Sequence, residues 1–401
     1  MVGQPLTDVR VLDLTHHIAG PYCTKLLGDL GAEVIKIEKP GEGDTARRIG
    51  PFPNDEPHLE KSGLFLYLNT NKRGITLNLK SETGKKIFKE LVKDADILVE
   101  NFEPRVMPSL GLDSPSLGEI NPKLVMTSIS NFGQTGTYRD YKATEIVAYA
   151  LGGLMYTCGN YDREPIKHGL SMGQMLTGAN AAASTLVALY CQREEGIGQH
   201  VDVSVTESVT QLCYVHQLIY FYGGMASRRR IRVGGKYGAF GDVFPCKDGY
   251  FVPIMIALEW DLLVNFFNAP DTLGKPEFTS AASRITHADE VDNALEALTR
   301  DRSKHELFHS GQEWRLPWAL VQDAKDLVNC PQLQARDFFV QIDHPMSGEL
   351  IYPGTPYKMS EIPPPQMYPA PLLGEHNEEI YCKRLGYTKE DLVRLRDRGV
   401  I

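Results

Sequence analysis

Residues 9–38, VRVLDLTHHIAGPYCTKLLGDLGAEVIKIE, decide the fold that we expect. The stretch begins with a short β-rich run, Val9–Leu14, and Gly20-Pro21 then opens a segment with helical spacing that ends at a glycine. A second β-rich run, Val34–Glu38, follows this segment. A strand, a helix and a strand at this spacing form a βαβ unit and predict a parallel sheet.

The same alternation continues along the chain. Further β-rich runs are Ile75–Lys80, Ile97–Phe102 and Leu124–Ile129, and a helix is expected over residues 81–95 with Ser81 as its cap. An open, doubly wound, Rossmann-like α/β sheet is therefore the expected architecture of the large domain.

Two later stretches complete this domain. Residues 198–224 alternate in hydropathy at first and then follow a helical period, which predicts a strand that runs into a long buried helix. The proline-rich stretch that begins at residue 362 predicts an extended segment laid across a surface, and residues 387–401 predict an amphipathic helix.

The length and composition indicate a soluble globular protein with two domains, or with one large domain that carries an insertion. The chain has 401 residues, which is too long for one ordinary core. The composition changes after residue 225 to a basic, glycine-rich stretch. We therefore expect a first part of the large domain over 1–225, a linker and a smaller α+β domain over 226–325, and a return segment over 326–401. A mobile glycine loop is expected over residues 234–241.

Charge and cysteine usage exclude several classes of protein. The formal net charge of -9 argues against a nucleic-acid binder, although a local cluster of cations can still bind an anionic small molecule. The seven cysteines are odd in number and contain no C-x-x-C pair, so we expect neither a disulfide scaffold nor a bound metal. The sequence shows no secretory signal and no membrane-spanning run, which predicts a cytoplasmic protein without a membrane partner.

Polar loops follow the expected strands, and ligands of such sheets bind beyond the carboxyl ends of the strands. Asn101 and Phe102 lie among these loops. The loops also carry six cations, which we expect to converge on one region: Lys39, Arg47, Lys72, Arg73, Lys80 and Arg105. Cations beside an apolar ring suit an adenine nucleotide, because the cations can bind its phosphates and the ring can contact its base. Each cation taken alone is equally well explained as an ordinary solvated surface charge. The sequence has no G-x-G-x-x-G after a strand and no P-loop.

A helix rich in small residues is expected over Gly169–Cys191. Its glycines, alanines and serine allow another backbone to come very close, which favours a tightly packed buried helix. Gln174 lies where a glycine turn becomes this helix, a common place for reactive groups.

Five blocks of the sequence together resemble one family. They are RVLDLTHHIAGPYCTKLLGDLGAEVIKIEKPGEGDTAR, NKRGITLNLK, ILVENFEP, GIGQHVDVSV and APLLGEHNEEI, in this order and over nearly the whole chain. The family is that of the class III CoA transferases, which includes formyl-CoA transferase, carnitine CoA-transferase and α-methylacyl-CoA racemase.

The resemblance implies two protomers threaded through one another like linked rings, with CoA or acyl-CoA as substrate and no metal. It also implies that CoA lies along the loops described above. The implied contact residues are His17, Ile18, Ala19, Lys39, Leu77, Lys80, Asn101, Phe102 and Lys142. The family often has arginine where this chain has Lys39. Lysine keeps the positive charge but cannot make the two parallel hydrogen bonds that a guanidinium makes to a phosphate.

The resemblance further implies a catalytic aspartate that attacks the donor thioester and later carries CoA as an enzyme thioester. In this chain its place falls at Gln174, whose neutral amide is a poor nucleophile. Residues 165–193 contain neither Asp nor Glu, so a shift of register supplies no carboxylate. Glu145 matches a carboxylate near the family's site and is assigned a supporting role, and Thr144 stands where the racemases have a histidine.

Three hypotheses follow. In the first, this chain is the subunit of a heteromeric CoA transferase that lacks the nucleophile, paired with an Asp-bearing paralogue. The two-subunit succinyl-CoA:(R)-benzylsuccinate CoA transferases of anaerobic toluene degradation offer a precedent, with a small carboxylic acid as acceptor. In the second, the chain is a self-sufficient transferase or hydrolase that uses other chemistry, with Glu145 as general base. In the third, it is a non-catalytic CoA-binding protein.

Overall fold

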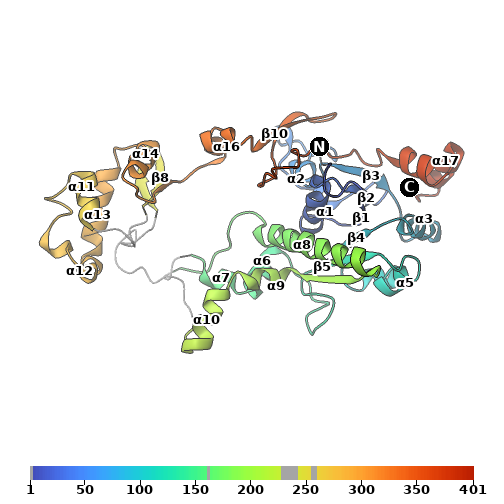
Figure 1. The fold of residues 1–401 in the computed structure, drawn as a ribbon, viewed down its shortest axis with the longest axis horizontal. Helices are drawn as coiled ribbons and strands as arrows, with labels where there is room; N and C mark the ends of the chain where they lie inside the picture. Colours follow the sequence, from blue (N-terminus) through green and yellow to red (C-terminus); the bar gives the residue numbers. More distant parts are fainter. Residues whose placement is uncertain (1–2, 160–162, 227–242, 254–259) are drawn as a thin grey trace. The chain divides into compact units, whose positions relative to one another are not determined.

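The structure is a computed structural model that describes residues 3–159, 163–226, 243–253 and 260–401 (Figure 1). The chain divides into two compact units. Unit 1 contains residues 1–155, 167–225 and 337–401, and unit 2 contains residues 156–166 and 226–336. Residues 326–336 and the described residues of 156–166, which the expected division assigns to the large domain, fall within unit 2. The expected glycine loop at 234–241 lies outside the described residues.

Unit 1 is built on a six-stranded parallel sheet. Its strands are β1 (Arg10–Asp13), β2 (Glu33–Glu38), β3 (Lys72–Thr76), β4 (Ile97–Glu100), β5 (Val125–Ser130) and β6 (His200–Ser204). They are arranged in the order β3-β2-β1-β4-β5-β6, and each neighbouring pair is parallel. The expected doubly wound α/β fold is confirmed. The strand order reverses between β1 and β4, which is the point where sheets of this kind commonly bind their ligands.

Helices cover both faces of this sheet. On one face α1 (Ala19–Asp29) and α8 (Met172–Glu195) lie against each other and against the strands (Figure 1). On the other face α3 (Glu82–Val92) packs with the C-terminal η4 (Glu378–Arg384) and α17 (Lys389–Asp397). Ser81 caps α3 by accepting a hydrogen bond from the Gly84 N–H, as the sequence predicts.

Shorter elements connect these layers. They are η1 (Thr45–Arg48), η2 (Pro53–Asp55), α2 (Gly63–Leu68), α4 (Val106–Leu110), α5 (Ser114–Gly118), α6 (Glu145–Leu151), α9 (Val205–Gln211), α10 (Tyr214–Gly223) and the antiparallel pair β10 (Phe339–His344) and β11 (Gly348–Pro353). The helix α7 (Leu154–Thr157) lies at the boundary of the two units. Residues 361–372 contain no helix or strand, in keeping with the expected extended segment.

The close approach of α8 to α1 depends on one glycine. A Cβ on Gly178 would lie 2.5 Å from the Ala19 carbonyl oxygen, which is too close for any side chain. The small residues of α8 therefore do what the sequence predicts, because they let the two backbones meet. The contact holds the N-terminal end of α8 beside the loop that leaves β1.

Two predicted elements were wrong in detail. The strand expected over residues 75–80 corresponds to β3, but β3 ends at Thr76. From Asn78 onward the backbone turns away from the sheet, because the Asn78 N–H donates to the Val400 carbonyl oxygen and the Asn78 side-chain oxygen accepts from the Lys80 N–H. The long buried helix expected after β6 is instead two helices, α9 and α10, and no residue of α10 is buried. Within the described chain the apolar side chains of α10 have no core to pack against.

Unit 2 is a small α+β structure. Its antiparallel strands are β7 (Phe244–Cys246), β8 (Gly249–Val252) and β9 (Ala319–Leu320). Its helices are α11 (Trp260–Phe267), η3 (Pro276–Phe278), α12 (Ala281–Thr286), α13 (Ala288–Thr299), α14 (Lys304–Glu313), α15 (Ala324–Val328) and α16 (Pro331–Ala335). An aromatic cluster around Trp318 forms the core of the unit.

A buried ionic network lies under the carboxyl ends of β1 and β2. The Lys72 ammonium is 3.0 Å from the Asp13 carboxylate, and the Lys36 ammonium is 2.9 Å from the Asp44 carboxylate. Burial alone would raise the pKa of Asp13, but Lys36 and Lys72 hold it far below its usual range. Burial lowers the pKa of Lys72 to about 8, so this pair is ionic at neutral pH.

Lys72→Met should destabilise unit 1 by about 3 kcal/mol, because it leaves the buried Asp13 carboxylate without its closest cation. The neighbouring exposed pair made by Arg73 offers a matched control, and Arg73→Met should cost less than about 1 kcal/mol. Urea unfolding followed by circular dichroism measures both variants. Equal losses for the two would contradict the importance assigned to the buried pair.

Candidate active site

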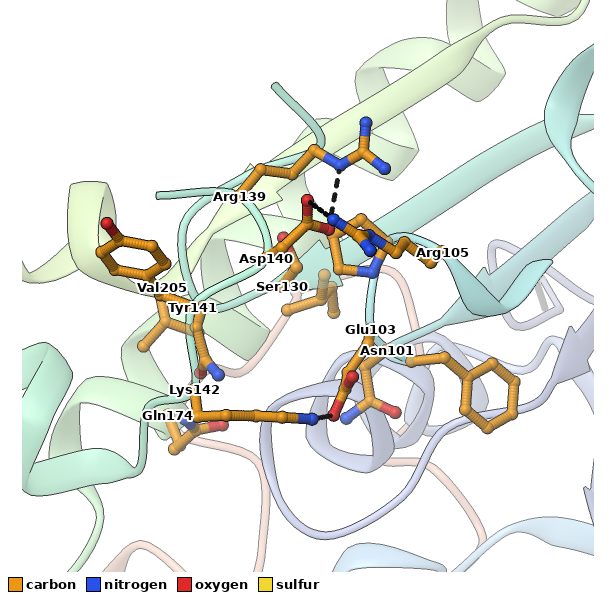
Figure 2. A pocket seen from close by; sticks show the side chains of 14 residues that line it. Asn101, Glu103, Arg105, Ser130, Arg139, Asp140, Tyr141, Lys142, Gln174 and Val205 are labelled. Atoms are coloured by element: carbon orange, nitrogen blue, oxygen red, sulfur yellow. Dashed lines mark hydrogen bonds and ion pairs between the residues drawn. The ribbon is translucent and has the colours of Figure 1, made fainter. Parts of the chain in front are cut away.

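A cavity of about 370 Å³ opens at the carboxyl ends of β4 and β5 (Figure 2). Its lining residues come from the loops after these strands, from the start of α8 and from the start of α9. They are Asn101, Phe102, Glu103, Pro104, Arg105, Ile129, Ser130, Asn131, Arg139, Asp140, Tyr141, Lys142, Gln174 and Val205. Five of the residues singled out from the sequence therefore lie together here: Asn101, Phe102, Arg105, Lys142 and Gln174.

Asn101 joins the loop after β4 to the loop after β1. Its side-chain oxygen accepts a hydrogen bond of 2.8 Å from the His16 N–H, and its amide nitrogen donates one of 2.8 Å to the His16 carbonyl oxygen. The Phe102 ring lies 5.4 Å from the His16 ring. The loop that lines the cavity is thereby tied to the loop that precedes α1.

The predicted residues 17–19 lie on that second loop and do not line the cavity. His17 has a left-handed backbone with φ of 71°, and its N–H donates to the Asp44 carboxylate at 2.9 Å. Ile18 and Ala19 are buried at the start of α1. The buried network below the sheet edge therefore fixes the course of this loop through Asp44.

The predicted cations do not all converge. Lys39 is exposed after β2, where it pairs with Glu42, and Lys80 lies beyond the end of β3. Leu77 is buried in the core between the sheet and α3. None of these three residues lines the cavity.

Three further cations were predicted to face an anionic ligand, and for these the prediction was wrong. Arg47 is buried against Glu38 and Glu60, and Lys72 is buried against Asp13. Arg73 lies near the amino end of β3, where it pairs with Glu33 and Glu379. Each has a carboxylate partner at least nine residues away in the sequence, and patterns over a few residues do not reveal such pairs.

The cations that do reach the cavity are held by carboxylates. Arg105 donates to Asp140 at 2.6 Å, and Arg139 Nε lies 3.4 Å from the other oxygen of the same carboxylate (Figure 2). Lys142 pairs with Glu103. The hydrogen bond from Arg105 lowers the pKa of Asp140, so this exposed cluster is charged at neutral pH.

Glu145 holds the N-terminal end of α8. One carboxylate oxygen accepts from the Gly173 N–H at 2.8 Å, and the other accepts from the Gln174 N–H at 3.1 Å. A carboxylate on the first N–H groups of a helix satisfies donors that have no partner inside the helix and suits the positive end of the helix dipole. Glu145 is thus the residue that positions Gln174 at the cavity.

Comparisons with known proteins agree with this geometry. Residues 6–377 match the family model described as CoA-transferase family III. The chain belongs to this family. It is 34% identical over 417 residues to a formyl-CoA:oxalate CoA-transferase from Streptomyces coelicolor, with 100% of both chains covered. It is 33% identical over 404 residues to a succinyl-CoA–D-citramalate CoA-transferase from Chloroflexus aurantiacus, with 99% and 98% covered.

A solved structure supports the same assignment. A CAIB/BAIF family protein from Brucella suis superimposes with a TM-score of 0.84 at 27% identity, over 95% of this chain and 99% of that chain. The resemblance stated from the sequence is confirmed, and the chain is a class III CoA transferase that moves CoA between an acyl-CoA and a carboxylic acid.

Two features are absent from the described part of the chain. It contains no helix that is long and apolar enough to span a membrane. Within the same residues no group of three or more His, Cys, Asp or Glu side chains is placed to hold a metal ion.

Several residues that line the cavity were not predicted. Ser130 and Asn131 follow directly after the expected strand Leu124–Ile129, and Arg139 and Tyr141 lie in the loop beyond. The rule that ligands bind beyond the carboxyl ends of parallel strands applies to this strand as well and could have found them. They were missed because the loop carries no family block and no glycine-rich phosphate motif.

Glu100 supports the wall of the site from inside. It ends β4, is only 3% exposed and accepts a hydrogen bond of 2.8 Å from the Phe102 N–H. Burial raises the pKa of Glu100 to about 7, with a smaller contribution from Asp202, against hydrogen bonds from Ser128 and Phe102 that lower it. The folded protein therefore keeps a proton that the unfolded chain has lost between pH 4.5 and about 7, and stability falls as pH rises through that window.

Glu100→Gln should remove this pH dependence, because the amide keeps an acceptor for the Phe102 N–H but cannot ionise. We expect the variant to be about 3 kcal/mol more stable than the natural protein at pH 8 and equally stable near pH 5. Thermal unfolding across this range checks the expectation, and Glu119→Gln at an exposed position serves as control. A stability difference that does not change with pH would contradict it.

Proposed function

We propose that this chain is the subunit of a heteromeric class III CoA transferase that does not carry the nucleophile. The observation that carries the proposal is Gln174, which stands at the cavity in the first turn of α8, in a segment without Asp or Glu over residues 165–193. Transfer through an enzyme thioester needs a side-chain carboxylate that attacks the donor thioester, which gives a mixed anhydride and releases the CoA thiolate. The neutral amide of Gln174 cannot make this attack or carry CoA afterwards as a thioester.

The described carboxylates nearby have other partners. Glu103 pairs with Lys142, and Asp140 is shared by two arginines. Both oxygens of Glu145 accept backbone hydrogen bonds from α8, which favours a supporting role over that of a general base.

A second comparison is in keeping with this view. The protein Rv3272 of Mycobacterium tuberculosis, which superimposes with a TM-score of 0.76 at 25% identity, has been crystallised as a variant with an aspartate replaced by alanine. An aspartate was therefore of interest in that homologue. We propose that the corresponding function in the present enzyme belongs to an Asp-bearing paralogous subunit.

The proposed partner also accounts for the exposed apolar surface of unit 1. The helix α10 presents Tyr214, Leu218, Tyr220, Phe221 and Tyr222 to solvent in the isolated chain. A helix that is apolar on all sides is stable where other elements surround it, which fits an interlocked arrangement with a second chain. We propose such an assembly in the cytoplasm.

We further propose that CoA follows the loops from β1 to β5. Its contacts are then the nine residues named from the sequence, of which Asn101, Phe102 and Lys142 line the cavity. The relatives act, by their names, on short carboxylic acids and on succinyl-CoA. Succinyl-CoA as donor and an aromatic succinate such as benzylsuccinate as acceptor, in anaerobic aromatic degradation, is the substrate pair that we propose.

The test is co-expression with the Asp-bearing paralogue, native mass spectrometry and a CoA-transfer assay with succinyl-CoA and benzylsuccinate. We expect a mixed oligomer that is active and a single chain that is not. Turnover by the purified single chain would contradict the proposal.

The variants Gln174→Asp and Gln174→Asn sharpen this test within the single chain. The aspartate should bring measurable transferase activity, because it restores a nucleophile at the head of α8. The asparagine has the same size without a charge and should bring none. Equal activities for the two variants would show that a carboxylate at this position is not what the chain lacks.

A further inference from the structure

One buried hydroxyl at the cavity lacks a partner. Ser130 ends β5, is 8% exposed and lines the cavity (Figure 2). Its Oγ makes no hydrogen bond to any described atom. Buried polar groups are nearly always hydrogen-bonded, because an unsatisfied hydroxyl loses its bonds to water without replacement. A hydroxyl kept at such a place indicates a partner that arrives with a ligand.

The charges around this hydroxyl indicate what kind of ligand it is. The residues that line the cavity include three cations, Arg105, Arg139 and Lys142, and two carboxylates, Glu103 and Asp140, which leaves a net charge of +1. Asp140 is shared by Arg105 and Arg139, so one guanidinium charge is not balanced within this cluster. Arg139 Nε is itself buried, and the carboxylate of Asp140, 3.4 Å away, is also bonded by Arg105.

We propose that the Ser130 hydroxyl and the Arg139 guanidinium form an oxyanion-binding corner of the cavity. This inference rests on the proposed function, because it takes the cavity to be the substrate site. The Ser130 hydroxyl has no hydrogen-bond partner, and the Arg139 guanidinium shares its carboxylate with Arg105. An anionic oxygen would satisfy the first group and balance the charge of the second. The substrates of the family offer two sources of such an oxygen: a phosphate of CoA and the carboxylate of the acid.

The test uses Ser130→Ala and Arg139→Gln in the assembly in which the protein is purified. Ser109→Ala is the matched control for the hydroxyl, because Ser109 is exposed on α4 and bonds to the Val106 carbonyl oxygen. Arg193→Gln is the control for the charge, because Arg193 pairs with Asp8 at the far end of α8. Titration calorimetry with CoA, with pantetheine, which lacks phosphates, and with succinate gives the affinities.

Ser130→Ala and Arg139→Gln should each weaken binding of the anionic ligand about tenfold, and the two controls should not. If a phosphate occupies the corner, the loss appears with CoA and not with pantetheine or succinate. If a carboxylate occupies it, the loss appears with succinate and not with CoA. Unchanged affinity for all three ligands, or no binding by the natural protein, would overturn the inference.

A stability measurement separates this role from a structural one. Removing a hydroxyl that has no partner should leave the melting temperature of the ligand-free protein unchanged or raise it. A clear loss of stability in Ser130→Ala would show that the hydroxyl has a partner inside the fold and would overturn the inference. These readouts do not depend on turnover, so an inactive single chain leaves them unaffected.

Discussion

The buried ion pairs beneath the sheet edge are the constraint on which the site depends. Asp13 and Lys72 join the end of β1 to the start of β3, and Lys36 of β2 pairs with Asp44. Asp44 then accepts the His17 N–H and so sets the loop that leads into α1. Charges buried at this depth are costly unless paired, so the loop geometry and the strand pairing stabilise each other.

A second set of contacts positions the elements that surround the cavity. Asn101 fastens the loop after β4 to His16, and the absent side chain of Gly178 lets α8 lie against the start of α1. Glu145 then holds the N–H groups at the head of α8. Three neighbouring elements thus hold Gln174 at the cavity, in a position suited to a reactive residue. Its own side chain is nevertheless neutral. A scaffold preserved around a chemically inert residue is what a specialised partner subunit is expected to show.

The sequence predicted the fold well wherever the signal was local. The alternation of β-rich runs and helical periods defined the parallel sheet, and Ser81 marked the start of α3 correctly. The prediction failed where a charged side chain finds its partner only in the folded state. Arg47 and Lys72 have the sequence context of surface cations, and only folding brings Glu38, Glu60 and Asp13 to them.

The candidate site shows the same division. Asn101, Phe102, Lys142 and Gln174 line one cavity. Asn101 and Phe102 follow from the rule that ligands bind at the carboxyl ends of parallel strands, whereas Lys142 was named only through the family resemblance. The engagement of Glu145 with the head of α8 and the unpartnered Ser130 hydroxyl depend on atomic positions that no pattern encodes. The exposed face of α10 was missed for a different reason, because apolar periodicity predicts burial without telling which chain provides the cover.

The most direct test of the account is the intact mass of each polypeptide after the mixed complex has been incubated with succinyl-CoA and quenched in acid. The account predicts that the mass of this chain stays unchanged, while its partner gains the mass of a covalently bound CoA. A CoA adduct on this chain would contradict the central claim, because it would show that the chain supplies a nucleophile of its own.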